Sequence, residues 1–410
     1  MKTIQTINVI GLGYIGLPTA ATLANAGFDA LGVDVRPDII AKINAGDIHI
    51  QEPGLDILVR AAVQRGKLRA AAQPSRADVF IIAVPTPIHA DKSPDLSFVE
   101  AATRTIAPVL EKENLVIVES TVPPRTCVDV VAPIIEQMTG LKHGADYDLA
   151  HCPERVIPGQ ILTEIIHNDR IVGGTTVEAT KRTAALYGSF VKGRLLETDA
   201  TTAEMCKLME NSFRDVNIAL ANELANIAEV LQIDIYEAIA LANRHPRVNI
   251  HTPGIGVGGH CIPIDPWFIA HVAPEKADLI RTARKINDAR PHLLAEKIIA
   301  AHREKPDSAI AFFGLSYKPN VDDFRESPAI EVVHQVAQNV LAPLYVVEPN
   351  ISELPPELQA FPHLVLTSAE NALKQAQLIV GLVNHTPFRT LDAAPFADKT
   401  VFDDLRIWRG

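Results

Sequence analysis

The chain has 410 residues, of which 47% are hydrophobic and 21% are charged. This is ordinary globular composition with enough length for two or three hydrophobic cores, and it excludes a disordered or fibrous protein. The formal net charge of −11 gives no broad basic surface. We therefore expect neither a nucleic-acid partner nor an anionic membrane partner, whereas a small anionic ligand held by a few Arg and Lys side chains fits the composition.

The cysteines and the N-terminal segment indicate the cellular compartment of the protein. The four cysteines are scattered, with no C-x-x-C pair, so the sequence predicts neither a disulfide framework nor a metal site. Glycines and Asn8 interrupt the apolar run at residues 7–28, so it resembles neither a signal peptide nor a membrane span. We expect reduced thiols and a cytoplasmic location. The cysteines are Cys127, Cys152, Cys206 and Cys261.

The chain begins with a predicted βαβ unit. A short apolar run at 7–10 predicts a strand, an Ala/Leu-rich stretch to Gly27 predicts a helix, and "ALGVD" at 30–34 predicts a second strand. The turn reads "GLGYIG", which places Gly11, Gly13 and Gly16 between strand and helix, and Asp34 ends the second strand. In this context the glycines predict a dinucleotide site, and a carboxylate at Asp34 favours NAD over NADP, although Arg36 follows closely.

Further elements extend this α/β pattern. Buried strands are predicted at 79–84 and 115–120, and their alternation with helix-length segments predicts a parallel sheet covered on both faces. Thr201 and Glu204 fit a capping box, which predicts one long helix from there to about Gln232.

One face of this long helix carries Lys207, Asn211 and Arg214, at spacings of four and three residues. The three side chains could form a solvated stripe. Alternatively, because Asn is a poor interior helix residue without a partner, a lysine and an amide on one face could stabilise an oxyanion.

The stretch "GVGGHCIPIDP" at 256–266 places Cys261 in a predicted irregular loop. A single cysteine is often a buried structural residue. However, Asp265 and Glu154 supply carboxylates that could orient or deprotonate water. Together with Lys207 and Asn211, these groups point to aldehyde oxidation through a covalent thiohemiacetal on a thiol.

A second, smaller α/β unit is predicted after "KPDS" at 305–308. Strands are expected at 310–315, 344–349 and 378–383, and helices from about Ala329 and at 368–377. The fingerprint glycines do not recur. We therefore predict three segments: an NAD-binding Rossmann domain (1–200), a central helical region carrying the lysine and the cysteine (201–304), and a C-terminal Rossmann-like α/β domain (305–410).

The motifs together resemble the UDP-glucose/GDP-mannose dehydrogenase family, and within it most closely the UDP-N-acetyl-D-mannosamine dehydrogenases. The resemblance runs along the whole chain in the same order. Its motifs are "GLGYIGLPTA", "AVPTP", "ESTVPP", "CPERVIPG", "AEMCKLMENSFRDVNIALANEL", "ANRHPRVNI", "GVGGHCIPIDPWFI" and "GLSYKPNVDDFRESPA".

The resemblance implies a function. Such enzymes oxidise the C6 alcohol of a UDP-sugar to a carboxylate with two NAD, here to UDP-N-acetyl-D-mannosaminuronate for surface polysaccharide. It also implies a C-terminal domain that binds the UDP part and a homodimer formed through the central helical region.

The resemblance implies site residues as well. Cys261 would be the nucleophile. Lys207 would serve in proton transfer and, with Asn211 beside it, would hold the oxyanion and the substrate. Glu154 and Asp265 would place water and help with protons. The implied NAD contacts, beside the glycines, are Tyr14, Ile15, Asp34, Thr86, Thr121 and Arg325. The implied sugar-nucleotide contacts are Arg155, Val156, Arg214, His245, Arg247, Gly258, Tyr317 and Lys318. His260 is interpreted as structural or substrate-shaping.

One departure and several alternatives remain. Close relatives have a basic residue followed by glycine where this chain has Leu405 and Arg406, so Arg406 either takes over that substrate contact by a one-residue shift or the contact is lost. The substrate could instead be UDP-N-acetylglucosamine or UDP-glucose. A single-step β-hydroxyacid dehydrogenase would not need Cys261, and a non-catalytic NAD sensor would need none of Cys261, Lys207 and Asn211.

Overall fold

The computed structural model describes residues 3–391 and 396–408. Contacts divide the chain into two units, which are described separately: residues 1–210 with 267–274, and residues 211–266 with 275–410. Among the described residues, no helix combines the length and apolar character needed to cross a membrane.

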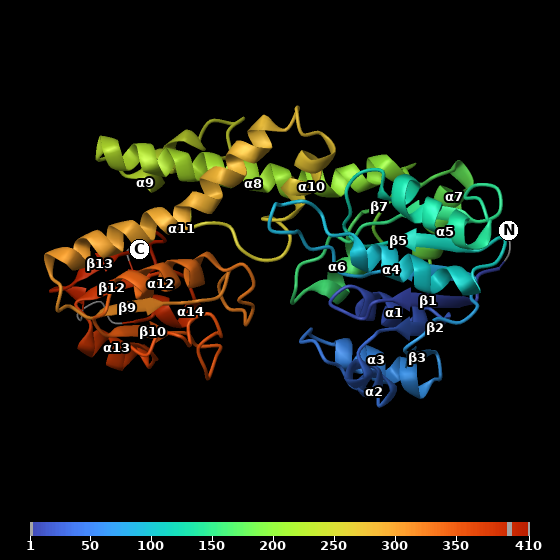
Figure 1. The fold of residues 1–410 in the computed structure, drawn as a ribbon, viewed down its shortest axis with the longest axis horizontal. Helices are drawn as coiled ribbons and strands as arrows, with labels where there is room; N and C mark the ends of the chain where they lie inside the picture. Colours follow the sequence, from blue (N-terminus) through green and yellow to red (C-terminus); the bar gives the residue numbers. More distant parts are fainter. Residues whose placement is uncertain (1–2, 392–395, 409–410) are drawn as a thin grey trace. The chain divides into compact units, whose positions relative to one another are not determined.

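The first unit is built on an eight-stranded sheet in the order β3-β2-β1-β4-β5-β6-β7-β8 (Figure 1). The prediction of a parallel sheet is wrong at one place, because β7 runs antiparallel to β6. Only the short helix α6 lies between them, and it does not return the chain to the end of the sheet at which β6 began. The strands are β1 (Thr6–Ile10), β2 (Asp29–Val33), β3 (Leu68–Ala71), β4 (Val79–Ile82), β5 (Leu115–Val118), β6 (Asp148–His151), β7 (Arg170–Gly174) and β8 (Leu195–Asp199).

Both faces of this sheet are buried. In β4, Val79 and Ile81 belong to one apolar core, whereas Phe80 and Ile82 belong to another. Helices α1, α3 and α7 contribute to the first core, and α4 and α5 to the second. This two-sided burial explains why the strands read as continuous apolar runs.

The helices of the first unit connect successive strands. They are α1 (Gly16–Asn25), α2 (Pro37–Asn44), α3 (Leu55–Gln64), α4 (Ser97–Ile106), the 3₁₀ turn η1 (Ala107–Val109), the π-turn η2 (Cys127–Val131), α5 (Ala132–Thr139), α6 (Ile161–His167) and α7 (Val177–Tyr187).

The long helix predicted from Thr201 is α8 (Ala200–Leu231), but the predicted capping box is wrong. Asp199 holds the helix start, since its carboxylate accepts the Thr202 N–H at 2.9 Å and the Thr202 hydroxyl at 2.6 Å. The Glu204 carboxylate is buried and accepts the backbone N–H groups of Arg125 and Cys127 at 2.5 and 2.8 Å. Because the Glu204 carboxylate binds these backbone donors, it does not cap the start of the helix.

The second unit contains a five-stranded parallel sheet in the order β11-β10-β9-β12-β13. Its strands are β9 (Ile310–Phe313), β10 (Leu344–Val347), β11 (Leu364–Leu366), β12 (Leu378–Gly381) and β13 (Thr400–Phe402). Its helices, together with α10, which crosses the division, are α9 (Ile235–Ala242), α10 (Asp265–Val272), α11 (Asp278–Glu304), α12 (Pro328–Asn339), α13 (Ala369–Gln375) and α14 (Thr386–Arg389).

This sheet is also buried on both faces. In β9, Ile310 and Phe312 pack in one apolar core with α11 and α12, whereas Ala311 and Phe313 pack in another with α13. The predicted fold class is confirmed: a Rossmann domain, a long central helix and a C-terminal α/β domain. The division into two units cuts α8 after Glu210, and the three predicted segment boundaries stay a prediction.

Candidate active site

The turn between β1 and α1 brings backbone atoms unusually close. Gly11 has a φ of +91°, and a Cβ there would lie 2.5 Å from the Ala83 carbonyl oxygen. A Cβ on Gly16 would lie 1.9 Å from the Gly11 carbonyl oxygen. Both glycines are therefore required by the turn itself.

Gly13 is different, because a Cβ at this position would meet nothing within 4 Å. Ile15 stands at the N-cap of α1 without a side-chain cap, and Tyr14 beside it is exposed. An open backbone at an uncapped helix N-terminus is what a pyrophosphate requires. The turn thus fits the dinucleotide predicted from the sequence.

Asp34 follows β2, and its carboxylate is tied to the turn. Oδ2 accepts the Leu12 N–H at 3.0 Å, and Oδ1 accepts the Arg36 N–H at 2.9 Å. The Arg36 guanidinium binds Asp38 at 2.5 Å, so it is already engaged by a carboxylate. This arrangement suits a ribose with free hydroxyls better than one carrying a phosphate.

The loops after β4 and β5 meet at the same edge of the sheet. The Thr86 hydroxyl donates to the Thr121 carbonyl at 2.7 Å. These two predicted NAD contacts are therefore brought together in the first unit. The remaining one, Arg325, lies in the second unit, where its guanidinium binds Asp323 at 2.6 Å.

The loop after β6 carries Glu154, Arg155 and Val156. Glu154 is buried and accepts the Arg155 N–H at 2.8 Å and a hydrogen bond from Arg170. The Arg155 guanidinium binds Glu210 of α8 at 2.8 Å, and Val156 is half-buried. Glu154 is thus part of an ion cluster rather than an isolated carboxylate.

Two members of that cluster, Glu119 and Arg170, were not predicted from the sequence. Glu119 follows β5, Arg170 begins β7, and their ion pair of 2.6 Å is almost fully buried. A charged residue directly beside a buried apolar strand was the only available signal for either one.

In the second unit, Asn211 is fully buried and finds the partners that an interior Asn needs. Its Nδ2 donates to the Asp265 carboxylate, and its Oδ1 accepts a hydrogen bond from Arg214. The backbone N–H of Asp265 donates to the Cys261 carbonyl at 2.9 Å, so one tight turn holds the backbones of these two residues together. Lys207, one helical turn earlier on α8 and in the first unit, is 9% exposed, so two of the three predicted side chains are buried and only Arg214 is exposed to solvent.

The loop that carries Cys261 is irregular, as predicted, and it packs against the segment after β9. A Cβ on Gly258 would lie 2.5 Å from the Glu326 carbonyl oxygen, and one on Gly259 would lie 2.9 Å from the Tyr317 ring. The Gly259 N–H donates to the Arg325 carbonyl at 3.1 Å. Close packing therefore explains Gly258 and brings it beside Tyr317.

The other predicted substrate contacts lie in three places of the second unit. Lys318 lies over the Tyr317 ring, with Nζ 5.5 Å from its centroid. His245 and Arg247 are exposed in the loop after α9. Arg406 binds Asp234 at the start of α9, and its guanidinium lies 4.3 Å from the centroid of the Tyr236 ring.

Three buried side chains of the first unit, Cys127, His151 and Glu204, have potential ligand atoms within 4.8 Å of one another. Burial raises the pKa of the Cys127 thiol well above its usual range and that of Glu204 to about 7. Metal ligands must be deprotonated, whereas Glu204 already accepts two backbone N–H groups and both ring nitrogens of His151 are buried with no hydrogen-bond partner among the described residues.

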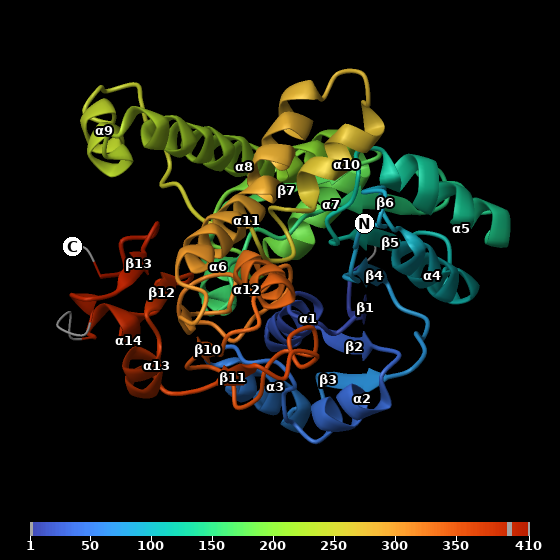
Figure 2. The ribbon, with the colours of Figure 1, turned by 60° about the vertical axis from the view of Figure 1, so that its left-hand side comes forward.

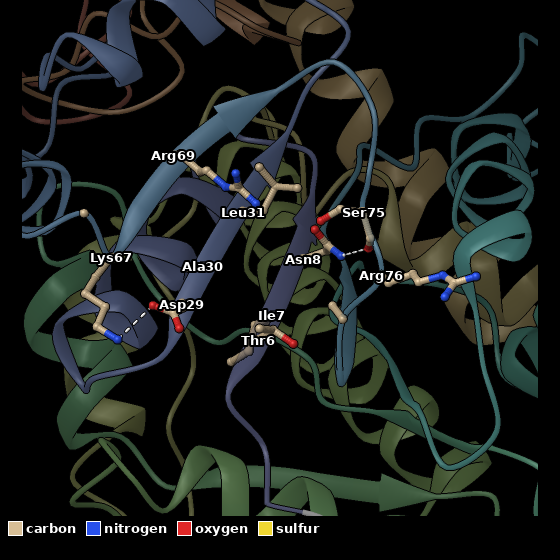
Figure 3. Close-up of a pocket in the computed structure, with 12 residues that line it drawn as sticks. Thr6, Ile7, Asn8, Asp29, Ala30, Leu31, Lys67, Arg69, Ser75 and Arg76 are labelled. Atoms are coloured by element: carbon tan, nitrogen blue, oxygen red, sulfur yellow. Dashed lines mark hydrogen bonds and ion pairs between the residues drawn. The ribbon is translucent and has the colours of Figure 1, made fainter.

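A small pocket lies at the edge of the first sheet where its parallel strands begin, opposite the edge that carries the glycine turn (Figure 3). It is lined by residues at the starts of β1, β2 and β3, with the Lys67–Asp29 ion pair at 2.8 Å and the Asn8 amide donating to Ser75. Since ligands of open α/β sheets bind at the carboxyl ends of the strands, this pocket is not the dinucleotide site.

Comparison with known proteins agrees with this geometry. The UDP-glucose/GDP-mannose dehydrogenase family matches through its NAD binding domain (residues 5–191), its central domain (201–289) and its UDP binding domain (311–409). An NDP-N-acetyl-D-galactosaminuronic acid dehydrogenase of Ralstonia solanacearum is 50% identical over 98% of this chain and 96% of its own. The UDP-N-acetyl-D-mannosamine dehydrogenase of Yersinia pestis is 46% identical over 99% of both chains.

A solved structure extends the likeness to the fold. The UDP-N-acetyl-mannosamine dehydrogenase of S. aureus superposes with a TM-score of 0.89 at 43% identity, covering 99% of this chain and 96% of that one. The resemblance seen in the sequence motifs is confirmed, and with it the cofactor NAD. The chain belongs to the UDP-glucose/GDP-mannose dehydrogenase family.

Proposed function

We propose that the chain oxidises the C6 alcohol of a UDP-N-acetylhexosamine to the carboxylate, with two NAD per turnover. Membership of the family makes it a UDP-sugar dehydrogenase. The observation that carries the finer proposal is the joining of Cys261, Asp265 and Asn211 by the turn at 2.9 Å and the buried amide–carboxylate hydrogen bond. A thiol, an amide and a carboxylate are the groups that a second oxidation requires.

The proposed chemistry proceeds in three stages. When bound, NAD would supply the hydride acceptor for both oxidations. The alcohol first loses a proton and a hydride to give the C6 aldehyde. The Cys261 thiolate then adds to the aldehyde carbon, and the resulting thiohemiacetal loses a proton and a second hydride, the latter to a second NAD, to become a thioester. Water finally cleaves the C–S bond, releasing the carboxylate and the thiol.

The chain's own side chains have distinct parts in this scheme. Lys207 and Asn211 stabilise the oxyanions, and Asp265 and Glu154 orient water or accept protons. Arg155, Val156, Arg214, His245, Arg247, Gly258, Tyr317, Lys318 and Arg406 are proposed to bind the sugar nucleotide.

Two sugars compete as the substrate. UDP-N-acetyl-D-mannosamine is our first candidate, because relatives at 46% identity and a solved structure with a TM-score of 0.89 carry that name. The galacto sugar is the second, favoured by the 50% identity to the Ralstonia protein. A panel of the UDP-activated manno, galacto and gluco N-acetylhexosamines and UDP-glucose, with NADH counted per mole of sugar, distinguishes them. Two NADH from one N-acetylhexosamine supports the proposal, and oxidation of UDP-glucose alone contradicts it.

The cofactor preference leads to a prediction at Asp34. Loss of a hydrogen bond to a charged group costs about 1.5–3 kcal/mol, so Asp34→Ala should weaken NAD binding about tenfold to a hundredfold and narrow its advantage over NADP. Asp47→Ala, which removes an exposed carboxylate of the same domain, is the control. Calorimetric titration of both nucleotides measures the effect, and tighter binding of NADP by the unmodified protein would refute the assignment.

We also propose a homodimer through the central helical region. No residue of α9 is buried, although the helix is rich in Ile, Leu and Ala, and it lies beside the C-terminal end of α8 in both views (Figures 1 and 2). On α8, Phe213, Leu220 and Ile227 are exposed at seven-residue spacing, which is the repeat of a helix–helix interface. Such an apolar surface fits a second copy of the chain.

The dimer is tested by light scattering of two variants. Val230, near the end of α8, and Leu241 of α9 belong to the same apolar surface and are 82% and 66% exposed. The double variant Val230→Asp with Leu241→Asp places two charges on it. The variant should be monomeric, whereas Leu341→Asp, at an 87% exposed position elsewhere in the second unit, should leave the mass unchanged. A monomeric unmodified protein would contradict the proposal.

A further inference from the structure

A closed set of buried polar side chains surrounds the Arg170 guanidinium in the first unit. Arg170 binds Glu119 at 2.6 Å and also Glu154, its Nε donates to the Cys152 sulfur at 3.2 Å, and its guanidinium lies 4.4 Å from the centroid of the Tyr187 ring. Each of these five side chains is at most 9% exposed. Water therefore contributes little to their solvation.

Glu119 connects this set to the dinucleotide turn. Its Oε2 accepts the hydroxyl of Thr19 on α1 at 3.0 Å, and its Oε1 accepts the Tyr187 hydroxyl at 3.2 Å. Along the chain, Glu119 lies two residues before Thr121. Arg170 thus joins the loop after β5 to the Glu154 loop, while Glu119 joins both to the helix that begins at the glycine turn.

The charges of this set do not balance unless a proton is bound. Two carboxylates face one guanidinium, and the remaining titratable groups, the Cys152 thiol and the Tyr187 phenol, are neutral in their protonated forms. An uncompensated buried charge is strongly unfavourable, so one carboxylate gains by binding a proton. Burial raises the pKa of Glu119 to about 7, with the neighbouring Glu154 adding to the shift and Arg170 opposing it.

We propose that Arg170 is a positioning residue, which fixes the Glu154 carboxylate for the reaction, and that Glu119 holds Arg170 in place and carries the proton that neutralises the set. The inference rests on the proposed function, in which Glu154 orients water or accepts protons. It extends the site to residues that do not themselves touch the substrate.

The proton on Glu119 is tested without any substrate. A carboxyl whose folded pKa is raised stabilises the fold below its unfolded value of about 4.5 and loses that contribution as the pH rises through about 7. Glu119→Gln imitates the protonated form at every pH, so its melting temperature relative to the unmodified protein should rise between pH 5.5 and 8.5. Asp148→Asn, at a carboxylate paired with Arg182 in the same domain, is the control and should show no such trend. If the difference in melting temperature between Glu119→Gln and the unmodified protein did not change with pH, the proposed proton on Glu119 would be wrong.

Positioning by Arg170 is tested by kinetics on the substrate that the panel identifies. Arg170→Lys should lower kcat at least tenfold with little change in the KM for NAD, and Glu119→Gln should remove an ionisation near pH 7 from the profile of kcat. Arg182→Lys, which also alters a buried arginine of the first unit, should leave kcat and the KM for NAD unchanged. If the unmodified protein oxidises a UDP-sugar but Arg170→Lys matches Arg182→Lys in kcat, the inference fails and the proposed function stands. If no UDP-sugar is oxidised, the proposed function fails, while the melting experiment still reports on Glu119.

Discussion

Replacement of Cys261 by Ala is expected to stop steady-state formation of the acid, by on the order of 10³-fold or more. An aldehyde has no hydride to give until a nucleophile has made its carbon tetrahedral. The turn that bonds the Asp265 N–H to the Cys261 carbonyl at 2.9 Å keeps the loop in shape without the sulfur, so sugar binding should survive. The variant should still oxidise the alcohol slowly to the aldehyde.

The experiment counts products and looks for the covalent intermediate. Unmodified protein, Cys261→Ala and Cys261→Ser are mixed with the UDP-sugar and NAD, NADH is counted per site, and mass spectrometry searches for an adduct on the thiol. Serine keeps the shape but is a weaker nucleophile and a poorer leaving group, so this variant should also fail. Cys206→Ala, at a cysteine of similar exposure, should keep its activity. Steady release of two NADH by Cys261→Ala at a normal rate would return Cys261 to a structural role.

The parts of the fold that the sequence predicted correctly are those encoded locally. The apolar strands of 79–82 and 115–118 were visible because both faces of the sheet are buried, which leaves no polar alternation to interrupt them. The glycine turn was visible because Gly11 and Gly16 are required by contacts within the turn. The sequence indicated that Asn211 needs a hydrogen-bond partner. It did not show that this partner is Asp265, 54 residues later.

What sequence reasoning missed depends on contacts between distant segments. Glu119, Glu154 and Arg170 come from three different strand ends, and nothing in their spacing shows that one guanidinium joins them. The capping box failed for the same reason, since the Glu204 carboxylate finds backbone donors near residue 125. The antiparallel direction of β7 depends on the path of the connection between β6 and β7, and no local sequence pattern encodes that path.

The second large effect is expected on stability, at the fully buried ion pair between Asp215 of α8 and Arg284 of α11, which bond at 2.5 Å. Asn287 also donates to the Asp215 carboxylate at 2.8 Å, but Arg284 is the cation that pairs with Asp215 among the described residues, and it also binds Asp288. Burial raises the pKa of Asp215, so water does not replace the lost partner. Arg284→Met should therefore cost about 3–5 kcal/mol, or roughly 6–20 °C in the melting temperature of a unit of this size.

The control and the double variant separate charge from packing. Lys285→Met removes an exposed cation from the next position of α11 and should change stability by less than about 0.5 kcal/mol. Adding Asp215→Leu to Arg284→Met removes the uncompensated charge and should recover most of the loss, because a well-packed apolar pair can replace a buried ion pair. Denaturant titration with fluorescence detection measures all three variants. Equal stability of Arg284→Met and Lys285→Met would show that Asp215 stays neutral in the core and that its ion pair with Arg284 adds nothing to the packing of α8 on α11.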